Sequence, residues 1–404
     1  MQHILDILKE RGFLAQITFE EDLYKALEKE PMTFYLGIDP TADSLHVGHF
    51  IPIIAASHLQ KAGHRPIILC GGGTAMIGDP SGKSDLRKMM TKETIAGNVA
   101  AIQKQLTRFM DFGEGKAMMV NNGDWLLNLN YIDFLREVGA LFSVNRMLTA
   151  ECYKRRLETG LTFLEFNYML MQSYDFLQLF QKYNCRLQIG GDDQWSNMLS
   201  GADLIRRKEQ QDAFALTCKL IMTHDGKKMG KTEKGALWLD PARTSPYEFY
   251  QYWRNVADAD VERFLGLLTF LPMDEVRRLG ALKDAQINEA KRVLAFEITK
   301  LVHGEEEAMK AQDAAQALFA GGGSSENVPT YEVNAAMLAE DSRLAMCGLC
   351  ASRGEARKMV QAGAVLVGEN KVTDIDACID ASQIGTDGLL LRKGKKNYCR
   401  LILK

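Results

Sequence analysis

The stretch MTFYLGIDPTADSLHVGH, residues 32–49, decides the fold. Its first part, Met32 to Ile38, is an apolar run that predicts a buried strand, and the Asp-Pro pair that follows ends this strand. Apolar residues then recur at helical spacing from Val47 to Ala62, and RPIILCGG at residues 65–72 predicts a second strand. A strand, a helix and another strand in this order predict a β-α-β unit with parallel strands.

The same pattern returns further along the chain. RLQIGG at residues 186–191 predicts a strand that ends in two glycines, and the next residues, 193–207, are compatible with a helix. Residues 91–182 and 245–318 have mostly helical apolar spacing. We therefore expect an α/β fold in which a Rossmann-like parallel-sheet domain with a helical insertion is followed by an all-α domain.

Composition indicates a folded protein of several domains. The chain has 404 residues, of which 46% are hydrophobic and 25% charged, an ordinary globular balance. Its net charge of −3 argues against a protein that coats nucleic acid by bulk charge. No apolar run approaches the roughly 18 residues of a membrane span, and no signal peptide is recognisable, so we expect a soluble, cytoplasmic protein without membrane contact.

The last part of the chain has a different charge. GGGSSENVPT, residues 321–330, has the composition of a flexible linker. Beyond it, residues 341–404 contain 11 basic and seven acidic residues, a net charge of +4, which favours contact with a polyanion over a merely solvated basic face.

The cysteines do not predict a metal site. Cys347 and Cys350 form a C-x-x-C pair, but no second close pair follows at zinc-ribbon spacing. We expect buried or idle thiols and no protein-bound structural metal.

Familiar nucleotide motifs are missing. GDPSGKS at residues 78–84 has one residue too few between its glycines for a P-loop, and GGGTAMIGD is no dinucleotide fingerprint. His46 and His49 instead flank Gly48 at the start of a helix, where free N–H groups attract phosphate and a glycine leaves room for a nucleotide. Zinc binding or simple packing of the two histidines stays open on this evidence alone.

A second element favours phosphate chemistry. GKKMGKTEKG, residues 226–235, places lysines among glycines in a segment that we expect to be a mobile loop able to close on a polyphosphate. A solvated run of charge is the alternative, but it does not explain the interspersed glycines.

These motifs resemble a known family. HVGH and KMGKT, about 180 residues apart, are similar to the HIGH and KMSKS signatures of class I aminoacyl-tRNA synthetases. YLGIDPTADSLHVGH, GDPSGK, FLEFNYMLMQSYDF, LQIGGDDQW and TSPYEFYQYW together resemble bacterial tyrosyl-tRNA synthetases over the whole chain. The resemblance implies that the protein activates L-tyrosine with ATP and then transfers tyrosine to the terminal adenosine of tRNA(Tyr).

The resemblance also implies a tyrosine site. Tyr35 and Asp175 match the residues that recognise the phenol, and an unpaired buried carboxylate makes phenylalanine a poor substitute. The other matching residues are expected to hold the ammonium group or to line the pocket. They are Asp79, Tyr168, Gln172 and Gln194.

For ATP, the resemblance assigns transition-state and leaving-group contacts to His46, His49, Lys228 and Lys231, and ribose hydroxyls to Asp193. Mg²⁺ is expected to arrive with ATP, held mostly by phosphates and water. The complete expected set of ATP contacts adds Gly37, Asp39, Gly48, Lys83 and Gly191.

The tail from about residue 338 resembles a small α+β RNA-binding domain shared with a ribosomal small-subunit protein. It is expected to bind tRNA through phosphates and shape. The candidate contacts are Arg353, Arg357, Lys358, Lys393, Lys395 and Lys396. We therefore expect a catalytic domain at 1–222 with a helical insertion, a lysine loop and helical domain at 223–320, a linker at 321–337 and the RNA-binding domain at 338–404.

A homodimer is also expected from the resemblance. Its interface is expected in residues 131–147, where Ile132, Leu135, Val138 and Phe142 could form one apolar face, although periodicity alone cannot separate an interface from an internal core. Two departures from the family pattern bear on the site. Leu36 replaces a cysteine of some members, and Asp192 stands where close relatives often have serine.

Three rival functions remain to be weighed. A tryptophanyl-like synthetase shares both signatures but needs no carboxylate for a phenol, which Asp175 supplies. An adenylyltransferase would leave the long helical region and basic tail unexplained. A catalytically idle RNA-binding homologue is at odds with intact HVGH and KMGKT motifs.

Overall fold

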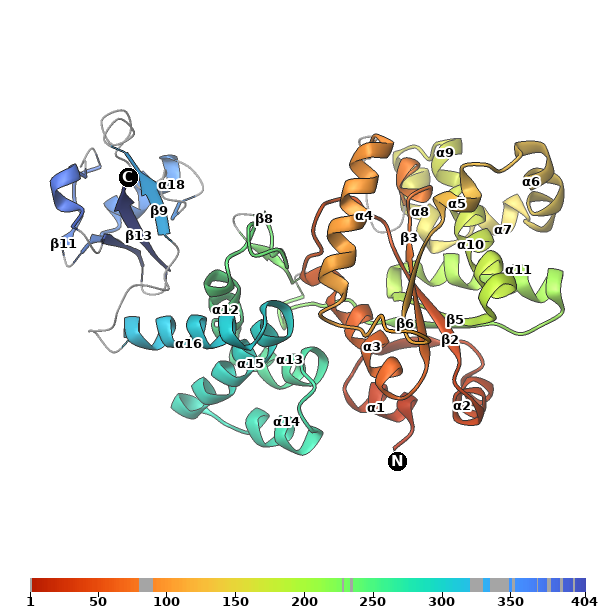
Figure 1. The fold of residues 1–404 in the computed structure, drawn as a ribbon, viewed down its shortest axis with the longest axis horizontal. Coiled ribbons are helices and arrows are strands. Elements are labelled where there is room, and N and C mark those ends of the chain that lie inside the picture. The colour runs from red at the N-terminus through yellow and green to blue at the C-terminus, as the bar shows by residue number, and fades with distance from the viewer. Residues whose placement is uncertain are drawn as a thin grey trace. The chain divides into compact units, whose positions relative to one another are not determined.

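The computed structural model describes residues 2–79, 90–226, 229–232, 235–319, 330–334, 349–350, 353–368, 370–375, 379–385, 388–394 and 397–404. The chain forms two compact units. The first unit comprises residues 1–230 and 257–282, and the second comprises residues 231–256 and 283–404. Figure 1 shows the course of the chain, and each unit is described by itself.

A six-stranded sheet forms the centre of the first unit, in the order β1-β6-β5-β2-β3-β4. All neighbouring strands run parallel except β1, which is antiparallel to β6. This confirms the expected parallel sheet. The strands are β1 (Leu14–Ile17), β2 (Thr33–Ile38), β3 (Arg65–Cys70), β4 (Met118–Asn121), β5 (Cys185–Gly191) and β6 (Phe214–Cys218).

The helix expected from Val47 to Ala62 is divided in the structure. A 3-10 turn, η1 (Val47–His49), precedes α3 (Phe50–Lys61), because the two histidine rings cap the turn, as described below. Helix α3 is apolar on nearly all sides, since it packs on β3 and β5 and is covered by α1 (Ile4–Glu10) and α13 (Val261–Leu268).

Two long helices, α10 (Tyr168–Tyr183) and α11 (Trp195–Glu209), pack against one another beside β5 (Figure 1). Helix α10 ends where Asn184 adopts a left-handed conformation with φ of 50°, which asparagine tolerates better than most residues. The helix carries three of the expected substrate contacts, so its packing positions the site.

The stretch expected to be mostly helical, 91–182, consists of helices joined by turns and loops, and β4 is its one strand. The remaining helices of the first unit are α2 (Glu20–Lys29), α4 (Lys92–Leu106), α5 (Gly123–Leu126), α6 (Tyr131–Glu137), α7 (Val144–Leu148), α8 (Glu151–Thr159), α9 (Phe163–Phe166) and α14 (Met273–Gly280). Strand β4 is too short for its alternation to be separated from helical spacing, and its parallel pairing with β3 defines it.

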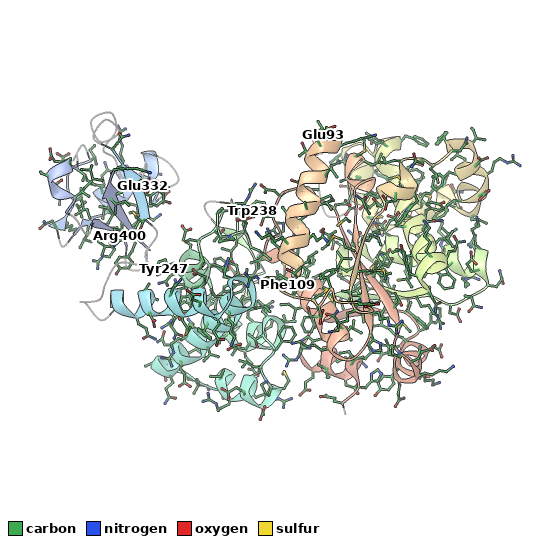
Figure 2. All side chains as sticks on the ribbon, viewed as in Figure 1. Glu93, Phe109, Trp238, Tyr247, Glu332 and Arg400 are labelled. Atoms are coloured by element: carbon green, nitrogen blue, oxygen red, sulfur yellow. The ribbon has the colours of Figure 1, made fainter. Side chains whose placement is uncertain are left out.

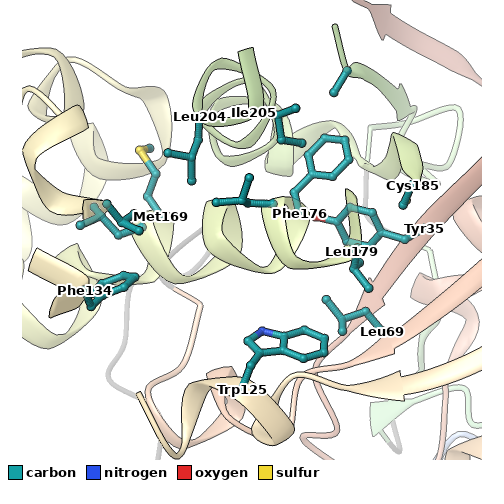
Figure 3. Packing of buried hydrophobic residues seen from close by; sticks show 14 of the residues in the cluster. Tyr35, Leu69, Trp125, Phe134, Met169, Phe176, Leu179, Cys185, Leu204 and Ile205 are labelled. Carbon is teal, nitrogen blue, oxygen red and sulfur yellow. The ribbon is translucent and has the colours of Figure 1, made fainter. Parts of the chain in front are cut away.

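One apolar core joins the helical insertion, which lies between β4 and α10 in the sequence, to the sheet. Figure 3 shows the Tyr35 ring of β2 beside Phe176 of α10, with ring centroids 5.2 Å apart. Trp125 and Phe134 from the insertion belong to the same buried cluster. Each such side chain contributes roughly 1.5–3 kcal/mol by its burial, so the insertion folds as part of the sheet domain.

Helices α13 and α14 belong to the first unit, although the sequence pattern groups residues 245–318 together. The guanidinium of Arg11 explains this, since it donates to the carbonyl oxygens of Gly266 at 3.1 Å and Thr269 at 2.9 Å. Arg11 is buried, and these bonds satisfy carbonyls at the end of α13.

In the second unit, α12 (Pro246–Arg254) packs against α15 (Ile287–His303) and α16 (Glu305–Phe319). Helix α12 starts at a capping box in which Ser245 and Glu248 exchange hydrogen bonds, with Pro246 at the first helical position. The short hairpin of β7 (Lys231–Thr232) and β8 (Gly235–Ala236) precedes it. Tyr247 on α12 is labelled in Figure 2.

The tail forms a small α+β fold, as expected. Its five strands have the order β11-β10-β12-β13-β9, and α18 (Arg353–Gln361) contributes Ala356 and Val360 to the same core. The strands are β9 (Thr330–Val333), β10 (Val365–Val367), β11 (Asn370–Lys371), β12 (Leu389–Lys393) and β13 (Asn397–Leu403). Figure 2 labels Glu332 and Arg400, which lie on the neighbouring strands β9 and β13. Within the described parts of the chain, no helix combines the length and apolar character that crossing a membrane requires.

Candidate active site

Polar side chains gather where the parallel strands of the first unit end. Asp39 follows β2, Asn122 follows β4, and Asp192 to Gln194 follow β5. Because the carboxyl ends of parallel strands meet at one edge, this edge is the usual ligand site of an open α/β sheet. Helix α10 brings further polar groups to it.

Tyr35 and Asp175 are the most deeply buried members of the expected site. The exposed fraction is 1% for Tyr35 and 2% for Asp175. Tyr35 Oη finds no hydrogen-bond partner among the described residues. Burial and the nearby charge of Asp175 raise the pKa of the Tyr35 phenol well above its usual value, so the phenol stays protonated. A buried O–H without a partner is a group that a ligand can satisfy.

Two donors hold the Asp175 carboxylate. Trp125 Nε1 donates to Oδ1 at 2.7 Å, and Asn122 Nδ2 donates to Oδ2 at 2.9 Å. Burial raises the pKa of Asp175 to about 7, while these two hydrogen bonds act in the opposite direction and the charge of Asp39 adds to the rise.

A continuous chain of hydrogen bonds runs from Asp175 to Tyr168. Asn122 Nδ2 also donates to Thr74 Oγ1 at 3.0 Å, and Thr74 Oγ1 in turn donates to Asp39 Oδ1 at 2.8 Å. Tyr168 Oη donates to the other oxygen of Asp39 at 3.1 Å. The two carboxylates are thus oriented by a shared network, in which every position is fixed by its neighbours.

Asp79 and Gln194 form a second hydrogen-bonded group in the site. Gln194 Nε2 donates to Asp79 Oδ2 at 2.8 Å. Buried Asn197, one turn into α11, donates from Nδ2 to Gln194 Oε1 at 3.2 Å and so orients the amide with its NH₂ group toward Asp79. Gln172 on α10 has a buried Oε1 that finds no hydrogen-bond partner among the described residues.

The side chains of His46 and His49 in HVGH both cap the 3-10 turn η1. Gly48 N–H donates to His46 Nδ1 at 3.0 Å, and His46 N–H donates to His49 Nδ1 at 3.2 Å. With both Nδ1 atoms accepting, the neutral rings carry their proton on Nε2, which makes Nε2 a donor. The ring centroids lie 4.1 Å apart.

Gly48 is required by the His46 ring. A Cβ built at Gly48 would lie 2.6 Å from His46 Cε1, well inside contact distance. Gly230 of KMGKT has a left-handed φ of 81°, and a Cβ there would lie 3.1 Å from Val47 Cβ. The two motifs, far apart in sequence, therefore touch through Gly230 and Val47.

The remaining expected ATP contacts are placed as follows. Gly37 is an exposed residue of β2, Gly191 ends β5, and Asp193 is exposed in the 3-10 turn η4 (Asp192–Gln194). The backbone of Lys231 begins β7. Lys83 and Lys228 lie outside the described residues.

In the tail, Arg357 and Lys358 are exposed on α18, and Arg353 is its first residue. Lys393 differs from them, because its Nζ lies 2.7 Å from Glu355 Oε1 and its side chain is only 13% exposed. Lys393 is thus partly neutralised within the fold. Lys395 and Lys396 lie outside the described residues.

Sequence reasoning missed the residues that orient the expected contacts. They are Thr74, Asn122, Trp125 and Asn197. Asn122 follows a strand that ends at the same sheet edge, but β4 has only four residues and could not be recognised from periodicity, so the sequence offered no usable signal for Asn122.

No cluster of three or more His, Cys, Asp or Glu side chains suited to a metal ion occurs in the ranges that the structure describes. Cys350 is buried, and Cys347 lies outside those ranges. Among the described residues of the first unit, the charged and titratable groups of the site include the two histidines and the carboxylates of Asp39, Asp79, Asp175 and Asp193.

Two family descriptions match the chain. "tRNA synthetases class I (W and Y)" matches residues 27–320, and "Tyrosine--tRNA ligase SYY-like C-terminal domain" matches residues 322–401. The matched ranges together span nearly the whole sequence.

Curated relatives match over their full length. A tyrosine–tRNA ligase of Caldanaerobacter subterraneus subsp. tengcongensis is 60% identical over 403 residues, covering 99% of each chain. A tyrosine–tRNA ligase of Clostridium perfringens is 60% identical over 405 residues, covering 100% of each.

Solved structures agree with this. The C-terminally truncated mitochondrial tyrosyl-tRNA synthetase of Aspergillus nidulans superimposes with a TM-score of 0.71 at 28% identity, covering 79% of this chain and 95% of that one. Its counterpart from Coccidioides posadasii gives a TM-score of 0.67 at 31% identity, covering 77% and 91%. A tryptophanyl-tRNA synthetase of Encephalitozoon cuniculi gives 0.57 at 13% identity, covering 76% and 86%, which shows a shared fold alone.

Proposed function

The chain belongs to the tyrosine–tRNA ligases of the class I aminoacyl-tRNA synthetases, and from this premise we propose how its residues divide the work. The enzyme activates L-tyrosine with ATP to tyrosyl-adenylate and pyrophosphate, and then transfers tyrosine to the 3′-terminal adenosine of tRNA(Tyr). Activation belongs to the carboxyl edge of the large sheet.

The observation that carries the assignment is the buried pair of Tyr35 and Asp175. The substrate phenol donates its proton to Asp175. Tyr35 Oη, which has no partner among the described residues, donates to the oxygen of the substrate phenol. Phenylalanine would leave Tyr35 Oη buried without a partner and would bring no donor to the buried Asp175 carboxylate. Rejection of phenylalanine by tyrosyl enzymes is the standard example of this rule.

The ammonium group of tyrosine binds at the other end of the pocket. Asp79 supplies a carboxylate, Tyr168 a hydroxyl, and Gln172 a buried carbonyl oxygen that finds no partner in the described part of the chain. An ammonium has three N–H donors, which matches three acceptors. Gln194, oriented by Asn197, completes the lining beside Asp79.

ATP binds beside the tyrosine carboxylate. A carboxylate oxygen attacks the α-phosphorus while the bond to the pyrophosphate oxygen breaks, so the protein supplies position and charge and needs no nucleophile of its own. His46 and His49 donate from Nε2 to phosphate oxygens, and Lys228 and Lys231 hold the departing pyrophosphate.

The nucleoside and the metal ion complete the ATP site. Asp193 takes the ribose hydroxyls, because it is exposed at the end of β5. Gly37, Gly48 and Gly191 leave the backbone accessible, and Asp39 and Lys83 lie in segments that follow β2 and β3. Mg²⁺ enters as part of the ATP substrate, coordinated by phosphates and water.

The tail binds tRNA. Arg357 and Lys358 are exposed on one helix, and Arg353, Lys395 and Lys396 extend the same basic character. Lys393 contributes less, because Glu355 already pairs with it. The domain boundaries proposed after residues 222, 320 and 337 divide the chain by these roles, whereas by packing the first unit extends to Gly230 and takes in residues 257–282, and β9 before residue 337 already pairs with β13 of the tail. The enzyme acts in the cytoplasm, where charged tRNA is consumed.

The enzyme acts as a homodimer through the insertion between β4 and α10. Large apolar side chains there are exposed, including Ile132 at 60% and Phe163 at 68%. Val138 is buried in the core instead, because it lies one helical turn after Phe134, which belongs to the same buried cluster. Sedimentation at micromolar concentration should give a dimer, which Ile132→Asp combined with Phe163→Asp should dissociate. A stable monomer of the unaltered protein would reject the dimer.

Pyrophosphate exchange into ATP, run separately with tyrosine, tryptophan and phenylalanine, tests the proposal. Tyrosine should be strongly preferred. Equal rates with phenylalanine would remove the role of the Tyr35 and Asp175 pair, and preference for tryptophan would favour the tryptophanyl alternative. Absence of exchange with intact tRNA binding would identify an idle homologue.

A further inference from the structure

Asp192 connects β1, the edge strand of the sheet, to η4, the turn that carries Asp193 and Gln194. Its Oδ1 accepts a hydrogen bond from Gln16 Nε2 at 2.8 Å and another from Thr217 Oγ1 at 2.8 Å. Gln16 N–H also donates to Thr217 Oγ1 at 3.1 Å, so the three residues form a closed triangle of hydrogen bonds, here called the Asp192 clamp. Each member comes from a different element: Gln16 from β1, Thr217 from β6 and Asp192 from the first position of η4.

The clamp lies at an irregularity of the sheet. The pairing of β1 with β6 shifts register between Leu14 and Gln16, which leaves Ala15 without a partner residue on β6. Thr217 Oγ1 accepts from Gln16 N–H at this point, in place of a ladder carbonyl. Side chains thus hold the strand where regular pairing is interrupted.

Neighbouring residues of η4 reach in opposite directions along the sheet. Asp192 reaches toward β6 and β1, whereas Gln194 reaches toward Asp79, which follows β3. The Asp192 carboxylate, which stands where close relatives often have serine, is therefore directed away from Asp79. Gln16 and Thr217 both donate to it. Asp193 lies between these anchored residues and is itself exposed.

We propose that the Asp192 clamp is a positioning device for ATP: Asp192, tied to Gln16 and Thr217, fixes the turn from which Asp193 meets the ribose. The proposal rests on the function assigned above to Asp193. Within the turn, Gln194 Nε2 donates to Asp193 Oδ2 at 3.4 Å, and Asp192, held by two strands, fixes where the turn begins, so residues on both sides of Asp193 set its direction. Asp192 does not need to touch the nucleotide, and it acts through Asp193.

The test is tyrosine-dependent pyrophosphate exchange with the full chain, measured over ATP and tyrosine concentrations. Asp192→Ala should raise the KM for ATP about tenfold while the KM for tyrosine changes less than about twofold, since one charged hydrogen-bonding group is lost outside the amino-acid pocket. Asp192→Asn retains an acceptor oxygen for both donors and should restore the KM for ATP to within about twofold of the unaltered enzyme.

Coupling to Gln16 provides a second readout. Gln16→Ala should raise the KM for ATP by a smaller factor, and this effect should disappear in the Asp192→Ala background, because the partner is already gone. Asp212→Ala is the matched control: Asp212 is exposed just before β6, at the opposite end of that strand from Thr217, and should leave both KM values unchanged.

Four outcomes would overturn the clamp. An unchanged KM for ATP in Asp192→Ala, beside a raised value in Asp193→Ala, would show that Asp192 is idle while the ribose assignment stands. Equal rises for ATP and tyrosine would show a merely structural role. Independent effects of Gln16 and Asp192 would show that no clamp joins them. An unchanged KM for ATP in Asp193→Ala would overturn the proposed ribose contact itself, and the clamp with it.

Discussion

Trp125 donates its indole N–H to Asp175 Oδ1 at 2.7 Å, so a residue of the insertion stabilises the charge on the carboxylate at the bottom of the site. Asp175 is almost fully buried, and its ionised form depends on such donors. The insertion therefore contributes to substrate recognition as well as to the core.

Replacing Trp125 with Phe should weaken tyrosine binding. The ring is nearly preserved, but a hydrogen bond to a buried carboxylate is lost, which costs roughly 1.5–3 kcal/mol. The KM for tyrosine in pyrophosphate exchange should rise about tenfold or more, and the KM for ATP should move little. Trp253→Phe, which removes another buried indole N–H, from α12 of the second unit, is the matched control and should leave both values unchanged. Equal KM values for tyrosine in both variants would contradict the role of Trp125.

The stability of the ligand-free enzyme should depend on Asp175 in a defined pH window. Its pKa rises from a usual 3.8 to about 7 in the folded state, so between these values the folded protein binds more protons than the unfolded chain. The contribution of this group is therefore largest below pH 3.8 and is lost as the pH rises toward 7. Urea unfolding from pH 5 to pH 8 should show a weaker decline in Asp175→Asn than in the unaltered protein.

Saturating tyrosine should also reduce the decline, because its phenol donates to the ionised carboxylate. Identical slopes in all variants would mean that Asp175 is ionised throughout this range.

Changing Gly48 to Ala should impair activation without preventing folding. The new Cβ would lie 2.6 Å from His46 Cε1 and would displace the ring whose Nδ1 accepts from the Gly48 N–H. A displaced donor at a developing phosphate charge costs on the order of tenfold or more in rate. Gly97→Ala, in α4 with open space around it, is the control and should not slow exchange. A Gly48→Ala enzyme with an unaltered rate would remove His46 from the mechanism.

Changing Lys231 to Ala should affect the transition state more than the ground state. A lysine that holds departing pyrophosphate matters most as that charge develops, so the activation rate should fall by about tenfold or more while tyrosine affinity barely moves. Equilibrium binding of tyrosine and single-turnover adenylate formation separate the two effects. A parallel fall in both would make Lys231 a ground-state ligand.

Truncation after Ala320 should separate activation from charging. All residues assigned to activation lie between Tyr35 and Lys231, and α16 ends at Phe319, so adenylate formation should remain nearly intact. Aminoacylation should collapse and tRNA binding should lose much of its salt dependence, because several phosphate contacts are removed. Lost activation with unchanged tRNA affinity at matched salt would show that the tail supports the catalytic fold.

The sequence predicted the three central strands, β2, β3 and β5, because long apolar runs such as residues 32–38 and 186–191 have few alternative structures, but it did not predict β1, β4 or β6. The spacing of Tyr168 and Asp175 on one helix also predicted a shared pocket, and both belong to one hydrogen-bond network. Local pattern was sufficient where a single element determines the geometry.

The local sequence pattern was not sufficient where segments distant in the sequence meet. Trp125 and Asn122 reach Asp175 from the region after β4, a strand too short to recognise by periodicity. The direction of Asp192 depends on Gln16 and Thr217, which are remote in sequence. Val138 is core rather than interface because it packs with Phe134 into the buried cluster, and apolar spacing alone does not say which partner an apolar face meets.

The hydrogen-bond chain from Tyr168 through Asp39, Thr74 and Asn122 to Asp175 has a consequence for engineering. The end that recognises the side chain of an amino acid and the end that recognises its backbone share one set of proton donors. A pocket redesigned to accept a modified aromatic ring by altering Asp175 would leave Asn122 with one acceptor fewer and thereby loosen Asp39. Libraries for such analogues should therefore vary Asn122 and Thr74 together with Asp175, since selectivity for the ring and affinity for the amino group cannot be tuned independently.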